Sequence, residues 1–419
     1  MQRRDILRGG IPIGVGLLSG CPSIGQSSVS PTPQNEGSTQ DTPPSTETAT
    51  EQSDQSVSLD GDAKTGVVGT EWSTAGRSGY RSYSTPDPGP EPPLETRWSV
   101  EAPPDSRTLV VDDGVLFGDW SYKAVTPDNG GVAWSKTSDR IDGSWCYDGL
   151  LHLYANSKIL QFDIESGERK TEISGLPASP DELIPFGELV AILKDGISVY
   201  DVRTGENRWT LSREDVEVID GIAHPEGLVS TEISKSDGGT PVTGSQSIRV
   251  YDPSTGEVKR DFDGPLLKRL ATDGKWLYGM PSDAVAGRVV GSAKTDCVSL
   301  EQETKLSSMD GYDRRAVDGG RIFVARSSSV NEGSGVYCFD GASGTRQWGK
   351  QVGLAETNII SAANRLYVGT GEKILVLDKE TGEQLTSIEV SKPIFRLCVS
   401  GTSLFATTYG DPNQGLLIR

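Results

Sequence analysis

The sequence predicts an all-β fold, an eight-bladed β-propeller closed by an N-terminal outer strand. Three observations lead to this fold class. A turn motif recurs along the chain, a strand signal precedes each turn, and the strand that the last unit lacks is matched by a segment before the first unit. Turn glycines Gly130, Gly167 and Gly205 follow one another at intervals of 37 and 38 residues. Such a period is typical of propeller blades, each of which is a four-stranded sheet.

The repeated turn places an aspartate four residues before a glycine. The five regular copies are Asp163 with Gly167, Asp201 with Gly205, Asp252 with Gly256, Asp340 with Gly344 and Asp378 with Gly382. The carboxylate can accept hydrogen bonds from amides of its own turn, and glycine tolerates the positive φ that a tight turn requires. Thr126 occupies the aspartate position of a variant copy, and a degenerate copy follows Cys297 with Glu303 at the glycine position.

Strand signals surround each turn. The residues just before the turn are apolar on both faces, as in Val250 and Tyr251, which predicts a strand buried between two sheets. The preceding strand signal occurs eight times, from Gly114 to Gly401. Outer strands follow the turns and are marked most clearly by Trp134, Trp209 and Trp348.

Both ends of the repeat region contribute to the last unit. Only seven outer strands follow the turns, and the chain ends at Arg419 inside the third strand of the eighth unit. The segment around Trp98 resembles the missing outer strand. A ring closed by both termini explains this offset and hides sheet edges from other chains. A seven-bladed ring is the alternative.

The N-terminal region is predicted to contain an export signal and a lipid-anchoring site. Paired Arg3 and Arg4 precede a short apolar stretch and resemble a twin-arginine export signal, and the residues ending at Cys21 resemble a lipobox. We expect a twin-arginine-type lipoprotein signal peptide over residues 1–20. Residues 21–69 form an acidic linker rich in Ser, Thr, Pro and Gln, predicted to be disordered, and residues 70–419 form the propeller. Cys21 would then bind membrane lipid on the outer face of the cytoplasmic membrane.

Composition restricts the classes of partner. The chain carries 59 acidic and 40 basic side chains, a formal net charge of −19, and its mean hydropathy is −0.38. These values argue against a polytopic membrane protein and against nucleic acid as a partner. An acidic surface suits a salty exterior, and we expect a halophilic, archaeal source.

The most complete copy of the repeat, Asp-x-x-Thr-Gly-x-x-x-Trp from Asp201 to Trp209, resembles the PQQ-like or quinoprotein-type propeller repeat, as does the opening around Trp72. The resemblance covers about residues 70 to 419. It implies a propeller fold, and it includes two functional classes. One consists of PQQ-dependent alcohol and sugar dehydrogenases. The other consists of non-catalytic lipoproteins, such as the propeller subunit of the outer-membrane β-barrel assembly machinery.

Residues for the chemistry of the first class cannot be placed. The resemblance implies adjacent cysteines, calcium ligands and a carboxylate base, whereas Cys146, Cys297, Cys338 and Cys398 are far apart in sequence and their disulfide pairing stays open. The two histidines, His152 and His224, form no metal-binding cluster, and Asp60 and Asp62 lack the remaining ligands of a calcium loop.

We therefore expect a non-catalytic, monomeric scaffold without a cofactor that binds a protein or envelope component. The alternative is a membrane-tethered PQQ-dependent alcohol or sugar dehydrogenase that uses PQQ and calcium. Carbohydrate binding through Trp120 and Tyr409 is a third hypothesis.

Two surfaces are predicted to bind the partner. Long connections over residues 231–247, 279–296 and 325–335 extend one rim, with Met280, Arg288 and Arg326 as candidate contacts. The alternative is that these connections are surface insertions without a binding role. First strands should line the channel and carry Arg107, Arg140, Lys268, Arg269, Arg314, Arg315 and Arg396, opposed by Asp181, Glu182, Asp215 and Glu217. This arrangement suggests a lopsided channel whose positive sector attracts an anion. Alternatively, half of these side chains point outward or between blades.

Overall fold

The computed structural model describes residues 83–419 except 104–106, 112–113, 119–120, 138–140, 195, 213, 215, 236–240, 282–293, 311–313, 327–333 and 353–358. Contacts divide the chain into units 1–56 and 57–419, and every described residue belongs to the second. The predicted signal peptide and linker, with Arg3, Arg4 and Cys21, lie outside the described residues. Within the described part, no helix has the length and hydropathy needed to cross a membrane.

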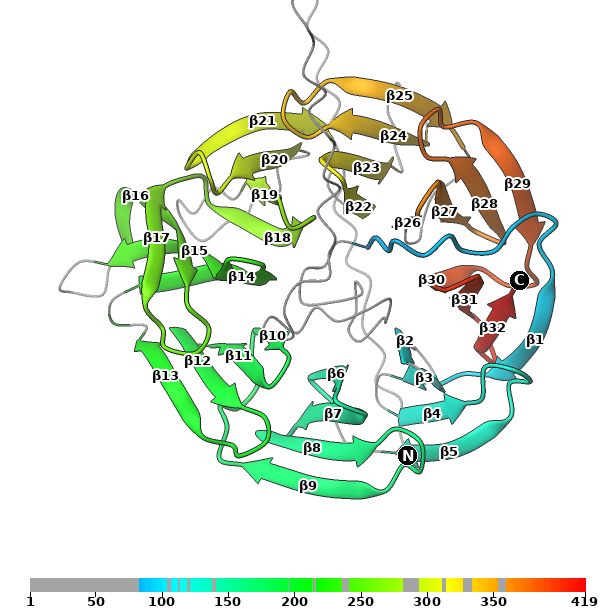
Figure 1. The fold of residues 1–419 in the computed structure, drawn as a ribbon, viewed down its shortest axis with the longest axis horizontal. Helices are drawn as coiled ribbons and strands as arrows, with labels where there is room; N and C mark the ends of the chain where they lie inside the picture. Colours follow the sequence, from blue (N-terminus) through cyan, green and yellow to red (C-terminus); the bar gives the residue numbers. More distant parts are fainter. Residues whose placement is uncertain are drawn as a thin grey trace, which may run out of the picture. The chain divides into compact units, whose positions relative to one another are not determined.

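The described residues form eight four-stranded antiparallel sheets arranged as a β-propeller, one sheet for each unit counted in the sequence (Figure 1). The first four sheets are β2 (Arg107–Val111), β3 (Gly114–Gly118), β4 (Ser121–Val125) and β5 (Val132–Thr137); β6 (Gly143–Tyr147), β7 (Leu150–Ala155), β8 (Lys158–Asp163) and β9 (Arg169–Ser174); β10 (Glu182–Phe186), β11 (Leu189–Leu193), β12 (Gly196–Asp201) and β13 (Asn207–Ser212); and β14 (Val216–His224), β15 (Gly227–Lys235), β16 (Pro241–Tyr251) and β17 (Val258–Asp263).

The next three sheets are β18 (Leu267–Thr272), β19 (Trp276–Pro281), β20 (Lys294–Ser299) and β21 (Thr304–Asp310); β22 (Arg314–Asp318), β23 (Arg321–Arg326), β24 (Gly335–Asp340) and β25 (Arg346–Gln351); and β26 (Ile359–Ser361), β27 (Arg365–Thr370), β28 (Lys373–Asp378) and β29 (Gln384–Glu389). The last sheet combines β30 (Ile394–Ser400), β31 (Ser403–Thr408) and β32 (Gln414–Ile418) with β1 (Thr96–Glu101). In every sheet the first strand is innermost and the fourth is outermost (Figure 1).

The N-terminal strand joins the last sheet, as the position of Trp98 predicts. Strand β1 pairs antiparallel with β32, with Trp98 opposite Leu417. Glu95 and Arg419 exchange two backbone hydrogen bonds of 2.8 and 3.0 Å just beyond the paired strands. Because β1 occupies the outer position, the sheet that ends the chain has the same four-stranded form as the others.

The core lies between neighbouring sheets. On β28, Val376 packs in one hydrophobic cluster with Phe405 of the last sheet, whereas Leu377 packs in another with Phe323 of the preceding sheet. All four side chains are at most 2% exposed. A third strand therefore contributes apolar side chains to two separate cores, which explains why its sequence is apolar at consecutive positions.

The turn geometry is the one expected from the sequence. The Oδ1 atom of Asp201 accepts hydrogen bonds from the amides of Arg203 and Thr204, at 2.8 and 3.2 Å. Gly205 has φ +75°, and the degenerate copy holds Glu303 at φ +52°. The left-handed conformation is therefore required at this position even where the sequence has no glycine.

Outer-strand tryptophans connect four of the sheets to the next. The indole Nε1 of Trp134 donates a hydrogen bond of 2.7 Å to the carbonyl of Ile164, the residue after the turn aspartate of the following sheet. The same bond joins Trp98 to Pro127, Trp209 to Pro253 and Trp348 to Lys379, at 2.8, 3.0 and 3.2 Å. Where tryptophan is absent, the Ser307 hydroxyl and the Gln161 amide donate to the equivalent carbonyls of Gly341 and Val202.

The contact between Trp134 and Gly167 gives a test of this connection. A Cβ at Gly167 (φ +67°) would lie 2.6 Å from Trp134 Cδ2, whereas a Cβ at Gly149 (φ +70°) meets nothing within 4 Å. We expect Gly149→Ala to lower the free energy of unfolding by about 1 kcal/mol through backbone strain alone. Gly167→Ala should cost roughly 1–3 kcal/mol more, because it overpacks the tryptophan.

Urea unfolding of both variants, with and without Trp134→Ala, measures the difference. The extra cost of Gly167→Ala should disappear when Trp134 is absent. An equal cost in both backgrounds would show that the tryptophan does not determine the requirement for glycine.

Candidate functional site

A pocket of about 240 Å³ opens between the innermost strands of three consecutive sheets. It is lined by Asp181, Glu182, Leu193, Lys194, Gly196, Val218, Ile219, Asp220, Lys268 and Arg269. Strand β14 contributes the middle of the lining, and β10 and β18 lie on its two sides (Figure 1). Acidic and basic residues that the sequence analysis assigned to opposing sectors therefore share one pocket.

Irregular pairing shapes the pocket wall. Strand β14 has a register shift between Val218 and Asp220, and β18 has one between Lys268 and Ala271. The Asp220 carboxylate accepts a hydrogen bond of 3.2 Å from the amide of Leu270, so it bridges the two irregular segments. The residue before Leu270, Arg269, has φ +53°. Bulges of this kind redirect side chains and occur often beside functional sites.

The other predicted channel residues are distributed differently. Arg315 is 8% exposed and its Nη1 lies 3.4 Å from Thr295 Oγ1, so it packs between sheets. The Arg396 guanidinium lies 4.8 Å from the ring centroid of Phe395. The strands that contain Arg107 and Arg314 are described but these side chains are not, and Arg140 and Asp215 lie outside the described residues.

The sheet β14–β17 carries a three-stranded ribbon that extends beyond its fourth strand. Strand β16 has 11 residues, and β14 and β15 have 9 each. Pairing along the ribbon reaches Val216 with Ser234 and Lys235 with Pro241, whereas β17 pairs only with residues from Ser247 to Tyr251 of β16. Residues 231–247, predicted as a long connection, are thus mostly strand. The sequence of β15 favours this longer strand, because β-branched residues alternate along it.

A buried ion network lies across the base of this ribbon. Glu232 of β15 is 0% exposed, and its carboxylate accepts hydrogen bonds from Arg249 Nη1 at 2.8 Å and from the Tyr251 hydroxyl at 2.7 Å. Arg249 Nε also lies 3.0 Å from Asp261 Oδ2 of β17. Burial is the largest single influence and lowers the pKa of Arg249, but Glu232, Tyr251 and Asp261 together outweigh it, so the net shift is upward. Strands β15, β16 and β17 are therefore held together by charges as well as by backbone hydrogen bonds.

One residue in the sequence signals this network. Glu232 interrupts the apolar second strand that begins at Leu228, where a buried carboxylate needs a partner. Its partners Arg249 and Asp261 come from two other strands. They can be identified only when the pairing of β15 with β16 and of β16 with β17 is known.

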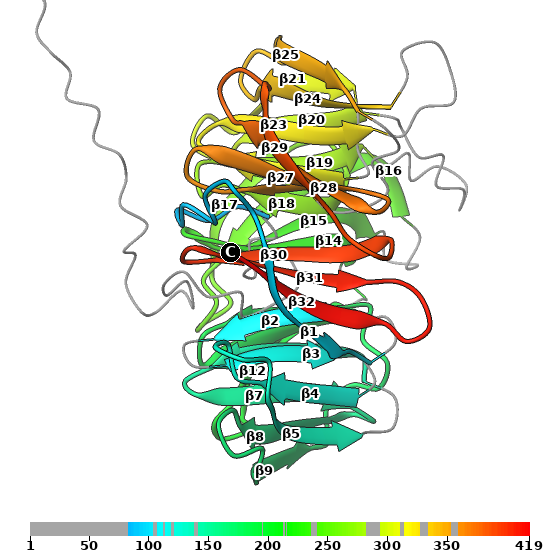
Figure 2. The ribbon, with the colours of Figure 1, turned by 90° about the vertical axis from the view of Figure 1, so that its right-hand side faces the viewer.

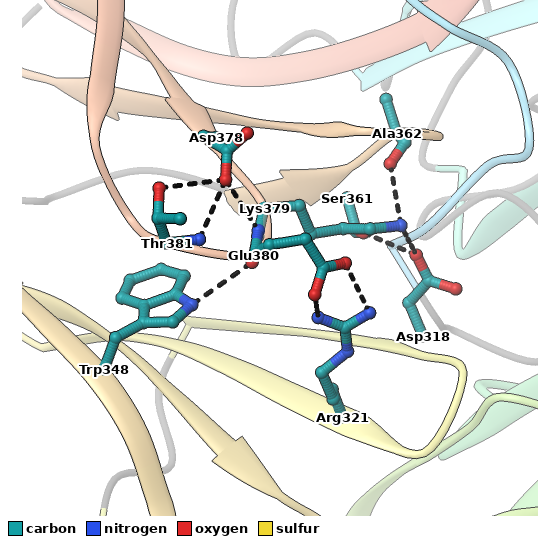
Figure 3. A network of polar contacts seen from close by, with 9 residues as sticks. All are labelled: Asp318, Arg321, Trp348, Ser361, Ala362, Asp378, Lys379, Glu380 and Thr381. Atoms are coloured by element: carbon teal, nitrogen blue, oxygen red, sulfur yellow. Dashed lines mark hydrogen bonds and ion pairs between the residues drawn. The ribbon is translucent and has the colours of Figure 1, made fainter.

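A second polar network joins β22–β25 to β26–β29 (Figure 3). The Asp318 carboxylate accepts hydrogen bonds from Lys379 Nζ at 2.9 Å and Ser361 Oγ at 2.6 Å. Both guanidinium Nη atoms of Arg321 donate to Glu380 at 2.7 Å, and this pairing lowers the pKa of Glu380. Because these residues connect sheets on either side of one joint, their role is structural.

The remaining predicted contacts divide into three groups. Met280 is 8% exposed within β19, so its assignment as a surface contact was wrong: the strand continues to Pro281, and the side chain is covered. Tyr409 is 56% exposed and lies 5.7 Å from the ring of Phe395. Arg288 and Trp120 lie outside the described residues, and the Arg326 side chain is not described.

Both histidines and the four cysteines in the described part of the chain are buried. His152 stacks on Trp145 with ring centroids 5.0 Å apart, and burial lowers the pKa of His152 and of His224 to about 4. Cys146, Cys297, Cys338 and Cys398 are buried thiols, and burial raises the pKa of Cys338 to about 12. Such thiols pack as small apolar groups.

Comparison with known proteins agrees with this architecture. A family model described as "Outer membrane protein assembly factor BamB" matches residues 193–406, just over half of the chain. The chain belongs to this family of PQQ-like propellers. No curated protein matches the sequence significantly.

Solved structures support the fold. BamB from Moraxella catarrhalis has a TM-score of 0.56 and 15% identity, with 78% of this chain and 97% of that chain covered. A europium-containing methanol dehydrogenase gives 0.59 and 9%, covering 83% and 98%. The computationally designed Ika8 protein gives 0.57 and 14%, covering 77% and 99%. At these identities the likeness shows the fold alone.

The described residues do not fit a calcium and quinone site. They contain no group of three or more His, Cys, Asp or Glu side chains that could hold a metal ion. The four described thiols are all buried and come from four different sheets, so they cannot supply the adjacent cysteine pair implied by the dehydrogenase resemblance.

The buried histidines predict a pH dependence of stability. Each has a folded pKa of about 4 against 6.5 for an unperturbed histidine. Between these values the unfolded chain binds protons that the folded chain does not, so stability falls as pH decreases. We expect a loss of roughly 2 kcal/mol per histidine between pH 7 and pH 5.

Urea unfolding at pH 7, 6 and 5 measures the combined loss from the two histidines. His152→Gln or His224→Gln should each remove about half of that combined loss. The turn carboxylates titrate below this window, because the Ser343 hydroxyl and amide hold the pKa of Asp340 below its usual value. Equal pH dependence in the wild type and both variants would contradict the assignment.

Proposed function

We propose that the protein is a non-catalytic scaffold, a lipoprotein anchored through Cys21 on the outer face of the cytoplasmic membrane, that binds a protein or envelope component. Its partner would bind at the ribbon of β14, β15 and β16. The single observation that carries this assignment is the extension of the ribbon past β17, with Lys235 paired to Pro241 beyond the last residue that β17 covers.

The ribbon has the properties of a preformed recognition element. It reaches the same side of the ring as the connection between β31 and β32 (Figure 2). The buried contacts of Glu232 with Arg249 and Tyr251 fix its base, so little conformational entropy would be lost on binding. The outer edge of β16 before Ser247 has no strand paired to it among the described residues, and an open edge offers backbone donors and acceptors to a partner.

Site-specific photocrosslinking in the native cell tests the position of the interface. A photoreactive residue at Ser234 or Gln246, on the ribbon, should give discrete crosslinked products. The same residue at Val258 or Leu385, which are 51% and 47% exposed on outer strands, serves as the matched control. Products from the outer strands but not from the ribbon would overturn the proposed surface.

The non-catalytic assignment has a separate test. Dye reduction with alcohols or sugars that requires added PQQ and calcium, and that is lost when they are removed, would contradict it. We expect the purified protein to show no such activity.

The anchor gives an independent prediction. Cys21→Ala removes the thiol that would carry lipid, so the variant should move from the membrane fraction to the soluble fraction. Arg3→Lys with Arg4→Lys should instead reduce export, because the twin-arginine pair is lost. Immunoblots of cell fractions measure both effects, and membrane retention of Cys21→Ala would rule out anchoring at this residue.

A further inference from the structure

Charged residues of both signs line the pocket between β10, β14 and β18. Asp181 and Glu182 lie at the start of β10, whereas Lys268 and Arg269 lie at the start of β18. Strand β14 stands between them (Figure 1) and contributes Val218 to the lining. Two acidic residues therefore lie at one end of the lining and two basic residues at the other, while Lys194 and Asp220 add one further charge of each sign.

The basic side is held in place by the neighbouring sheet. Arg269 has φ +53°, a backbone conformation that non-glycine residues adopt only at an energetic cost. The hydrogen bond from the Leu270 amide to Asp220 of β14 supports this conformation. Strain of this kind persists where the surroundings determine it, and it is concentrated at ligand sites. The backbone on the basic side of the pocket is thus tied to β14.

We propose that this pocket binds a small zwitterion, either a free α-amino acid or a dipeptide with free ends. The ligand ammonium would face Asp181 and Glu182, and the ligand carboxylate would face Lys268 and Arg269. Charge-assisted hydrogen bonds at both ends are the strongest that a polar pocket can offer. Val218 and Leu193 would contact the carbon atoms between the two charges.

Size and charge limit the ligand class. A volume of about 240 Å³ is below the range of pockets that hold drug-sized molecules, so the ligand is small. Three basic and three acidic side chains line the pocket, which disfavours a ligand with a large net charge of either sign. The site is independent of the partner proposed for the ribbon, and either proposal can fail without the other.

Isothermal titration of the purified full chain with alanine and dialanine tests the site. Concentrations on the order of 10 mM would nearly saturate a site with a Kd of 1 mM. We expect saturable binding of at least one of the two. The tighter binder shows whether the ligand is a free amino acid or a dipeptide. Acetate, ethylammonium and N-acetylalanine amide, at matched ionic strength, should bind at least ten times more weakly, because each lacks one or both charges.

Two variants assign the binding to the two sides of the pocket. Lys268→Ala and Asp181→Asn should each weaken binding at least tenfold, whereas Lys136→Ala on the outer strand β5 should leave it unchanged. Thermal unfolding of each variant without ligand shows whether the fold is retained. Absence of binding by both zwitterions would overturn the proposal. So would acetate binding that equals alanine binding and is unaffected by Asp181→Asn, since this would indicate a simple anion site.

Discussion

The structure depends on side-chain hydrogen bonds that run from one sheet to the turn of the next. In the joint between Trp134 and Ile164, the indole both donates to a carbonyl and covers Gly167, so one side chain fixes the spacing and the angle of two sheets. The equivalent carbonyls also accept from other donors, Ser307 on the outer strand β21 and Gln161 on the third strand β8. What the fold requires is a donor at this position, and tryptophan adds apolar area to it.

Local signals account for how much of the fold could be predicted. A turn is determined by residues close in sequence, so Glu303 could be recognised as the occupant of a left-handed position without being glycine. The outer strand around Trp98 could be recognised because it repeats a pattern seen elsewhere in the chain. The end of a strand is less well determined, and Met280 was placed in a connection although β19 continues through it.

The candidate site could be predicted only in part, because it depends on register between segments far apart in sequence. The bond from Leu270 to Asp220 spans 50 residues and joins two irregular strands, which no local pattern reveals. Sequence analysis identified Asp181, Glu182, Lys268 and Arg269 as channel residues, but it could not show that they share one pocket. Register also decides that Glu232 meets Arg249, so the buried network was missed.

The pairing of β1 with β32 determines when the ring can close during synthesis. The residues that pair there, from Thr96 with Ile418 to Glu101 with Gln414, lie about 300 positions apart. During synthesis the other sheets can form in order, but this one must wait until the last strand has left the ribosome. Until then β1 exposes an unpaired edge, and the apolar face of the first sheet lacks its neighbour. The ring can therefore close only after strands β1 to β32 have all been synthesised.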